Sequence, residues 1–79
     1  MIEAFVLIIV KPGNEDKVYE KLKGTPQVKE IYKVYGEYDI IARIEVENIK
    51  ELDHFHDEIL RRINEIEMTE TLIASSYRG

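Results

Sequence analysis

At the centre of the chain stands the run Val34-Tyr35-Gly36-Glu37-Tyr38-Asp39-Ile40-Ile41, a glycine turn between two segments rich in Val, Ile and Tyr (residues 28–35 and 39–46). Glycine reaches positive φ without a Cβ clash, so a short connection containing glycine between two such segments predicts a β-hairpin. The free amides of the turn can then bind an anion, while the Asp39 carboxylate can bind a cation. A molecule that carries both charges on one carbon is an α-amino acid.

The segments on either side of this hairpin predict two helices and a first strand. Residues 2–10 are apolar at both alternating sets of positions, which is typical of a strand covered on both faces. A short helix is expected between Pro12-Gly13-Asn14 and Gly24-Thr25-Pro26, which are breaking and stopping signals. A longer helix is expected to begin at Asn48, which forms a capping pair with Glu51, and its apolar positions recur at helical spacing as far as Ile66.

The remaining segment completes the predicted fold. Residues 69–77 contain β-branched and aromatic side chains and predict a final strand. The element order β-α-β-β-α-β is typical of a ferredoxin-like α+β sandwich, in which two helices cover one face of an antiparallel sheet. Since the sequence shows no linker or low-complexity segment, we expect a single domain over residues 1–79.

Chain length and the first strand together predict an oligomer. A chain of 79 residues buries only about 60% of its unfolded surface, so its own core is small. Phe5, Leu7 and Ile9 are expected on the sheet face that the helices leave open, and an apolar patch on so small a domain favours a partner. We expect a homodimer packed sheet to sheet or edge to edge. The alternative is a covering C-terminal loop, although only residues 77–79 remain at the end of the chain to form it.

Composition limits the classes of function. The absence of cysteine excludes a disulfide framework, thiolate zinc sites and a cysteine nucleophile, and it fits the reducing cytoplasm. The apolar residues 4–10 follow no basic leader and are too few to span a bilayer, so no membrane partner is expected. A formal net charge of -5 argues against direct nucleic-acid binding, because phosphate contacts need clustered Lys and Arg.

Three motifs carry a resemblance to a known family. They are Pro26-Gln27-Val28-Lys29-Glu30, Tyr35-Gly36-Glu37-Tyr38-Asp39 and Thr69-Glu70-Thr71-Leu72-Ile73. Over essentially the whole chain, they resemble the effector-binding RAM module of the Lrp/AsnC feast/famine transcription regulators. The resemblance implies a ferredoxin-like fold of the dimeric α+β barrel type, with dimers that assemble further, often into an octamer. It also implies small effectors, commonly amino acids, bound between dimers.

The resemblance also assigns the candidate ligand-binding residues. They are Gly36, Glu37, Tyr38 and Asp39 in the effector loop, and Thr69 and Thr71 on the last strand. Full-length members carry an N-terminal helix-turn-helix domain, whereas this chain begins at the first strand. It therefore resembles the stand-alone modules, with no DNA-binding domain in residues 1–79. Transcription regulation is then expected through oligomerisation or through co-assembly with DNA-binding relatives.

The predicted function is a non-catalytic amino-acid sensor that needs no cofactor, metal or catalytic residue. The alternative is an enzyme, because the same dimeric architecture hosts small cofactor-free monooxygenases and isomerases. Against the enzyme, serine occurs only at Ser75 and Ser76, and no histidine stands beside a candidate nucleophile. His54 and His56 lie about 200° apart around a helix, so they are expected on a solvated face without a shared metal. A deep pocket lined by either histidine would instead favour the enzyme.

The candidate residues also have structural roles as alternatives. Asp39 can hold an effector ammonium, but an aspartate beside a glycine turn also accepts turn amides and pins the hairpin. Thr69 and Thr71 can donate hydroxyl hydrogens to a carboxylate, or they can be ordinary strand residues. Tyr35 and Tyr38 can line a pocket, although packing against cross-strand neighbours is the favoured interpretation.

Overall fold

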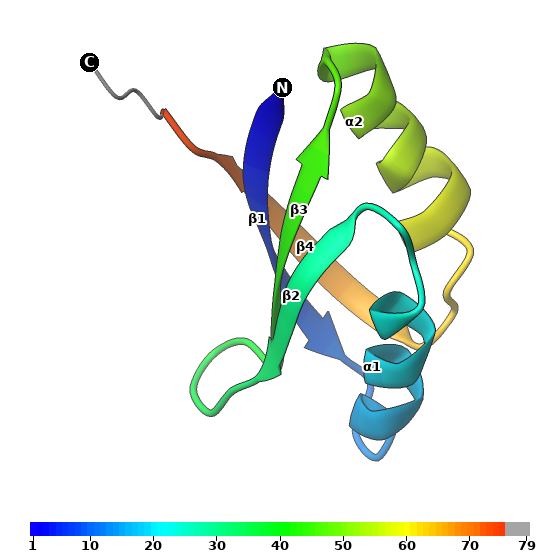
Figure 1. Ribbon diagram of the computed structural model, residues 1–79. Helices are drawn as coiled ribbons and strands as arrows, with labels where there is room; N and C mark the ends of the chain where they lie inside the picture. Colours follow the sequence, from blue (N-terminus) through cyan, green and yellow to red (C-terminus); the bar gives the residue numbers. More distant parts are fainter. Residues whose placement is uncertain (76–79) are drawn as a thin grey trace.

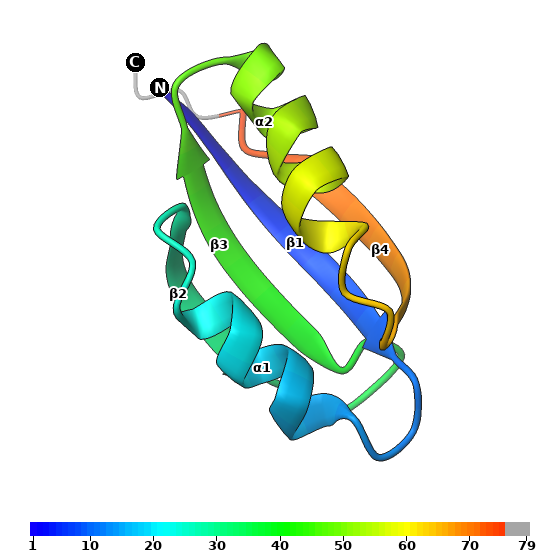
Figure 2. The same ribbon diagram turned by 90° about the vertical axis from the view of Figure 1, so that its right-hand side faces the viewer.

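The computed structural model describes residues 1–75 as a four-stranded sheet with two helical segments (Figure 1). The elements in chain order are β1 (Ile2–Val10), α1 (Glu15–Lys23), β2 (Val28–Lys33), β3 (Ile40–Val46), α2 (Ile49–Phe55), the π-helical turn η1 (His56–Leu60) and β4 (Ile66–Ile73). The strands lie in the order β2-β3-β1-β4, and every neighbouring pair is antiparallel. Both helices lie on the same face of the sheet, as Figure 2 shows. The predicted ferredoxin-like sandwich is confirmed.

The core lies between the sheet and the helices. Because successive strand residues point to opposite faces, every second residue of β1 and β3 points toward the helices. These inward residues are buried, and they are Ala4, Val6, Ile8, Val10, Ile40, Ala42, Ile44 and Val46. The helices cover them with Val18 and Leu22 of α1 and with Leu52 and Phe55 of α2. Removal of these apolar surfaces from water is the main force that holds the two layers together.

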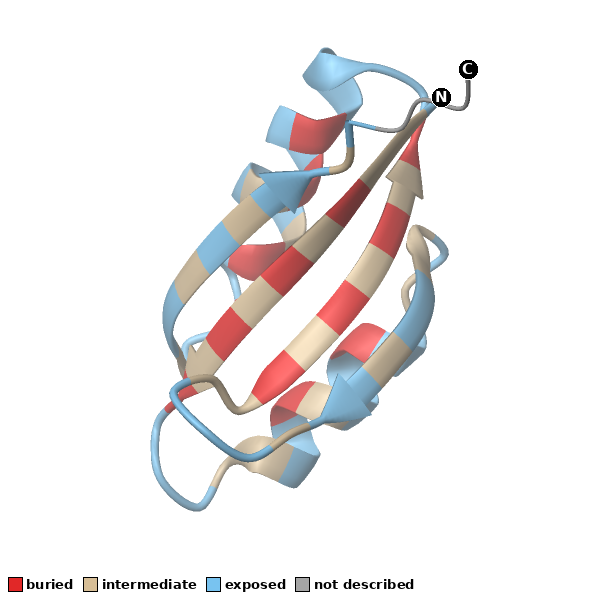
Figure 3. Cartoon of the chain, turned by 90° about the vertical axis from the view of Figure 1, so that its left-hand side faces the viewer, coloured by how far each residue is buried: buried red, intermediate tan, exposed pale blue. Residues whose placement is uncertain are grey.

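The opposite face of the sheet carries apolar side chains that are only partly buried. Phe5, Leu7 and Ile9 of β1 and Ile41 of β3 alternate with the core residues and point away from the helices. Figure 3 views the molecule from this side, with both helices behind the sheet. We call this surface the open face. The alternative of a covering C-terminal loop concerns residues 77–79, which lie outside the described part of the chain.

One charged cluster occupies an end of the open face. The Arg43 guanidinium lies 3.0 Å from the Glu3 carboxylate, 3.0 Å from that of Glu30 and 2.7 Å from that of Glu45. Hydrogen bonds to Glu45 and then Glu30 raise the pKa of Arg43 above its ordinary value. Three carboxylates surround one guanidinium, so this end of the open face carries excess negative charge. We call these four residues the Arg43 cluster.

The middle strands are shorter than the sequence predicted. β2 ends at Lys33 instead of residue 35, and β3 begins at Ile40 instead of residue 39. Residues 34–39 leave the sheet as a loop, which Val34 N–H closes through a hydrogen bond of 2.9 Å to the Asp39 carbonyl oxygen. The hairpin itself is confirmed, since β2 and β3 are paired antiparallel.

The second helix begins as predicted and ends earlier. Its N-terminus is capped by the Asn48 side chain, which accepts a hydrogen bond of 2.9 Å from the Glu51 backbone N–H. Its helical geometry ends at Leu60, although the apolar spacing predicted a helix to Ile66. Beyond Leu60, the N–H of Ile63 bonds to the Leu60 carbonyl and the N–H of Ile66 bonds to the Ile63 carbonyl. Turns of this kind keep a three-residue spacing, which a periodic pattern cannot distinguish from a helix.

The last strand is shifted toward the N-terminus relative to its prediction. β4 begins at Ile66 rather than at residue 69, because the chain turns back toward the sheet directly after η1. It ends at Ile73, whereas the prediction extended to residue 77. Residues 76 and 77 of that prediction lie outside the described part of the chain.

Phe55→Ala should lower the free energy of unfolding by about 3–5 kcal/mol, because its removal leaves a cavity in the core. The Phe55 side chain is 1% exposed. Ile49→Ala on the same helix should change the free energy by less than about 1 kcal/mol, because Ile49 is 52% exposed. Urea unfolding followed by circular dichroism at one chain concentration measures both variants. Equal losses would contradict the assigned core.

Candidate functional site

The loop of residues 34–39 projects from the sheet on the side away from the helices (Figure 1). Gly36 has a φ of 124°, which residues with a Cβ rarely adopt. The Tyr38 hydroxyl donates a hydrogen bond of 2.6 Å to Glu70 Oε1, which ties the loop to β4. That hydrogen bond raises the pKa of Tyr38 above its ordinary value. Gly36 and Glu37 are exposed, so the loop presents its polar groups at the surface.

Asp39 extends the hydrogen-bonded ladder of the central strand. Its backbone N–H donates to the Ile8 carbonyl at 2.8 Å, and its Oδ2 accepts a hydrogen bond of 2.8 Å from Val10 N–H. The side chain therefore supplies an acceptor at the end of β1 where the β3 backbone has left the ladder. Asp39 thus fixes the loop to β1. This resembles the structural alternative for Asp39, in which its carboxylate pins the hairpin, except that the amide it accepts from belongs to β1. Its role toward a ligand stays a prediction.

Asp39 also lines a hollow of about 380 Å³ between the loop and the start of α1. The other lining residues are Glu15, Asp16, Lys33, Val34 and Tyr35. Tyr35 is fully exposed, so the favoured interpretation of Tyr35 as a packing residue is wrong. The physical reason is that β2 ends before Tyr35 and gives it no cross-strand neighbour.

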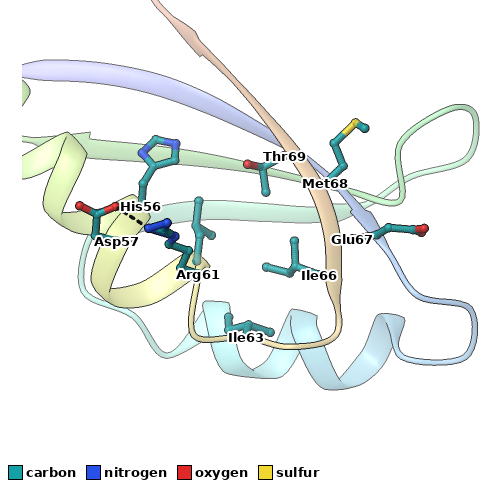
Figure 4. A pocket seen from close by; sticks show the side chains of 9 residues that line it. His56, Asp57, Arg61, Ile63, Ile66, Glu67, Met68 and Thr69 are labelled. Carbon is teal, nitrogen blue, oxygen red and sulfur yellow. Dashed lines mark ion pairs between the residues drawn. The ribbon is translucent and has the colours of Figure 1, made fainter.

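A second hollow lies between η1 and β4 (Figure 4). We call it the ligand groove, and its volume is about 480 Å³. The lining residues are His56, Asp57, Leu60, Arg61, Ile63, Ile66, Glu67, Met68 and Thr69. The Arg61 guanidinium lies 3.6 Å from the Asp57 carboxylate, drawn as a dashed line in Figure 4. Cationic, anionic and apolar side chains in one groove suit a small zwitterion with an apolar part.

His56 occupies a different place from the one predicted. It is partly buried, and its Nε2 lies 2.6 Å from Thr71 Oγ1 while its Nδ1 lies 3.0 Å from the Leu52 carbonyl oxygen. The predicted solvated position is therefore wrong for His56 and correct for His54, which is exposed. The η1 turn faces β4, whose Thr71 supplies the hydrogen-bond partner, and helical spacing alone does not report such a contact across the fold.

Asp39 and the two threonines lie on opposite sides of β1, although Tyr38 of the same loop reaches Glu70 of β4. Asp39 bonds to Ile8 and Val10 from the β3 side, whereas Thr69 pairs with Ile8 from the β4 side. The ligand groove contains Thr69 and no residue of the 34–39 loop, and neither threonine lines the hollow beside Asp39. Thr71 meets His56 instead. One chain therefore does not bring the loop and the threonines into a common cavity.

The sequence did not reveal the floor of the ligand groove. Leu60, Ile63 and Ile66 form it, although their pattern was interpreted as a continuous helix. The spacing of Asp57 and Arg61 is a signal that was available, because side chains four residues apart on a helix are neighbours.

Within residues 1–75, no group of three His, Cys, Asp or Glu side chains is placed to hold a metal ion. Within the same range, no helix has the length and apolar character that crossing a membrane requires.

The chain matches the family model described as the Lrp/AsnC ligand binding domain, over residues 3–77. The HTH-type transcriptional regulator FL11 of Pyrococcus furiosus is 39% identical over 72 residues, covering 91% of this chain and 47% of FL11. This chain spans about half the length of the curated relatives that it matches.

Two solved structures share both sequence and fold with the chain. The crystal structure of FFRP-DM1 is 49% identical with a TM-score of 0.90, covering 94% of this chain and 99% of that one. The hypothetical protein PHS023 from Pyrococcus horikoshii is 47% identical with a TM-score of 0.91, covering 98% and 93%.

These matches favour the regulator over the enzyme. The relatives are named as transcriptional regulators, and the matched family model is a ligand-binding domain. The ligand groove does contain His56, the feature that would have favoured an enzyme, but both ring nitrogens are engaged by Leu52 and Thr71. The chain belongs to the Lrp/AsnC family of transcription regulators, as an example of its ligand-binding domain.

Proposed function

We propose that this domain is a cytoplasmic amino-acid sensor that regulates transcription through its own assembly or through co-assembly with DNA-binding relatives. Family membership and the two charged hollows support this role. Residues 1–79 act as one effector-binding unit in this proposal. With a formal net charge of -5, they do not bind duplex DNA themselves, and contact with DNA comes from the relatives.

The effector site is formed by two copies of the chain. The observation that carries this proposal is the separation of Asp39 from Thr69 and Thr71 by strand β1. A loop of one copy, with Gly36, Glu37, Tyr38 and Asp39, would reach the ligand groove of another copy. Since Oδ2 of Asp39 accepts only one hydrogen bond from Val10, the carboxylate retains acceptor capacity for an effector ammonium. The effector therefore lies between chains and its binding is coupled to assembly.

The open face supports a homodimer as the first step of assembly. Phe5, Leu7, Ile9 and Ile41 form a partly buried apolar surface on a domain with a small core. Packing two open faces together removes this surface from water, as in a sheet-on-sheet sandwich. Contacts between such dimers would then bring the loops to the grooves, giving a higher assembly such as an octamer.

Light scattering at micromolar concentration should give a mass of a dimer or a multiple of it. Leu7→Lys should shift the protein to monomer, because it places an unpaired charge in the apolar interface. Glu20→Lys, which adds a lysine on the exposed surface of α1, is the matched control and should leave the mass unchanged. A monomeric wild type would contradict both the dimer and the site between chains.

Asp39→Asn should weaken binding of the preferred amino acid about ten- to hundredfold, because a charge-assisted hydrogen bond is worth roughly 1.5–3 kcal/mol. The asparagine oxygen can still accept from Val10 N–H, so the melting temperature should stay close to that of wild type. Calorimetric titration of the twenty amino acids identifies the effector and measures the loss. Glu20→Gln, on the exposed surface of α1, is the control. Unchanged affinity in Asp39→Asn would remove Asp39 from the site.

Mixing two weakly binding variants tests whether each site takes residues from two chains. Asp39→Asn impairs the loop half of the site, and Thr69→Val impairs the groove half. If the halves come from different chains, random mixed assemblies should restore roughly a quarter of the sites. If both halves come from one chain, no site is restored. Calorimetry on the separately refolded and the co-refolded variants distinguishes the two results.

A further inference from the structure

His56 holds two hydrogen bonds whose directions can be assigned. Its Nδ1 lies 3.0 Å from the Leu52 carbonyl oxygen and its Nε2 lies 2.6 Å from Thr71 Oγ1. A carbonyl oxygen only accepts, so Nδ1 carries a hydrogen. In the neutral ring Nε2 is then bare and accepts, which makes the Thr71 hydroxyl the donor.

Thr71 does not line the ligand groove, but it lies on the same side of β4 as Thr69, which does. The direction of its hydrogen bond determines what Thr71 offers to a ligand at the edge of the groove. While the hydroxyl hydrogen points at His56, the Thr71 oxygen presents only lone pairs, which repel a carboxylate. When His56 is protonated, both ring nitrogens donate and the Thr71 oxygen accepts from Nε2–H. The hydroxyl hydrogen is then released for another acceptor. The direction expected from the sequence, in which Thr71 donates to a carboxylate, therefore requires protonated His56.

The charges around the ligand groove strengthen this effect. Asp57 and Arg61 line it from the helical side, and Glu67 lines it from β4. The β4 residues beside His56 on the helix-facing side of the sheet, Thr69 and Thr71, are uncharged, and β1 adds only apolar side chains there. With neutral His56, the two carboxylates outnumber the one guanidinium. Protonation of His56 balances the groove and lowers its repulsion of an anion.

We infer that His56 is a specificity-determining residue of the ligand groove, whose protonation admits the carboxylate of an amino acid beside Thr71. The inference rests on the proposed function and deepens it, because it assigns the carboxylate end of the effector to the groove and leaves the ammonium end to Asp39 of another copy. Histidine ordinarily changes charge between pH 5 and 8, whereas carboxylates ordinarily titrate below this range and arginine above it. Affinity for the effector should therefore be higher at pH 5.5 than at pH 7.5.

Nitrogen-15 NMR of the histidine side chains tests the hydrogen-bond assignment without any ligand. At pH 7.5 the ring of His56 should be the tautomer with its hydrogen on Nδ1. The exposed His54 serves as the internal reference. A neutral His56 with its hydrogen on Nε2 would overturn the inference.

Calorimetric titration of the twenty amino acids at pH 5.5 and pH 7.5 tests the consequence for binding. The preferred amino acid should bind wild type about tenfold more tightly at pH 5.5, the size of one charge-assisted hydrogen bond. His54→Gln, which removes the other histidine, should keep this gain, and His56→Gln should lose it. The amine that lacks the carboxylate of the same amino acid should show no gain. An equal gain in His56→Gln would overturn the inference.

Two further measurements separate this inference from the proposed function. If no amino acid binds at either pH, the proposed function fails, and propionate then decides the inference. Propionate should shift the NMR signals of Thr69 and Thr71 more at pH 5.5 than at pH 7.5 in wild type, and the absence of any such difference overturns the inference.

If His56→Gln does not fold, Thr71→Val replaces it. The pH-dependent gain in affinity should then fall to about threefold, because only the charge effect of His56 remains. A full gain in Thr71→Val would contradict the role of its hydroxyl.

Discussion

Strand β1 is hydrogen-bonded along both edges, and the rest of the structure depends on this position. It pairs with β3 on one side and with β4 on the other, so it carries the register of the whole sheet. Its inward residues, Ala4, Val6 and Ile8, are fully buried and belong to the core between the sheet and the helices. The same strand separates Asp39 from Thr69. In the proposed site the two residues come from different chains, and ligand binding is then coupled to assembly.

The fold could be predicted from the sequence because buried apolar residues recur with one spacing along a strand and with another along a helix. The apolar run of β1, the alternation in β3 and the cap at Asn48 were recognised correctly. The end of the second helix was not, because Ile63 and Ile66 are held in turns that repeat every three residues. Period alone reports that a side chain is buried, and it does not report which backbone geometry buries it.

The candidate site was predicted only in part, and the missing part has a single cause. The identities of Gly36, Asp39 and Thr69 came from motifs that are contiguous in the sequence. The floor of the ligand groove and the contact of His56 with Thr71 join residues from separate elements, and no local pattern encodes such a contact. The arrangement of hydrogen-bond donors and acceptors around Thr71 therefore became visible only in the folded chain.

The Arg43 cluster has a consequence for how two copies orient on each other. If two open faces pack together, overlap of their Arg43 clusters would concentrate negative charge. The favoured orientation therefore keeps the two clusters apart and packs the apolar ends of the two faces, near Leu7 and Ile9, against each other. The charged ends then lie at the rim in water, where salt screens them over about 10 Å. A related chain with a lysine opposite the cluster matches this surface better than an identical copy does. A single substitution can thus convert a self-pairing face into one that prefers a different partner.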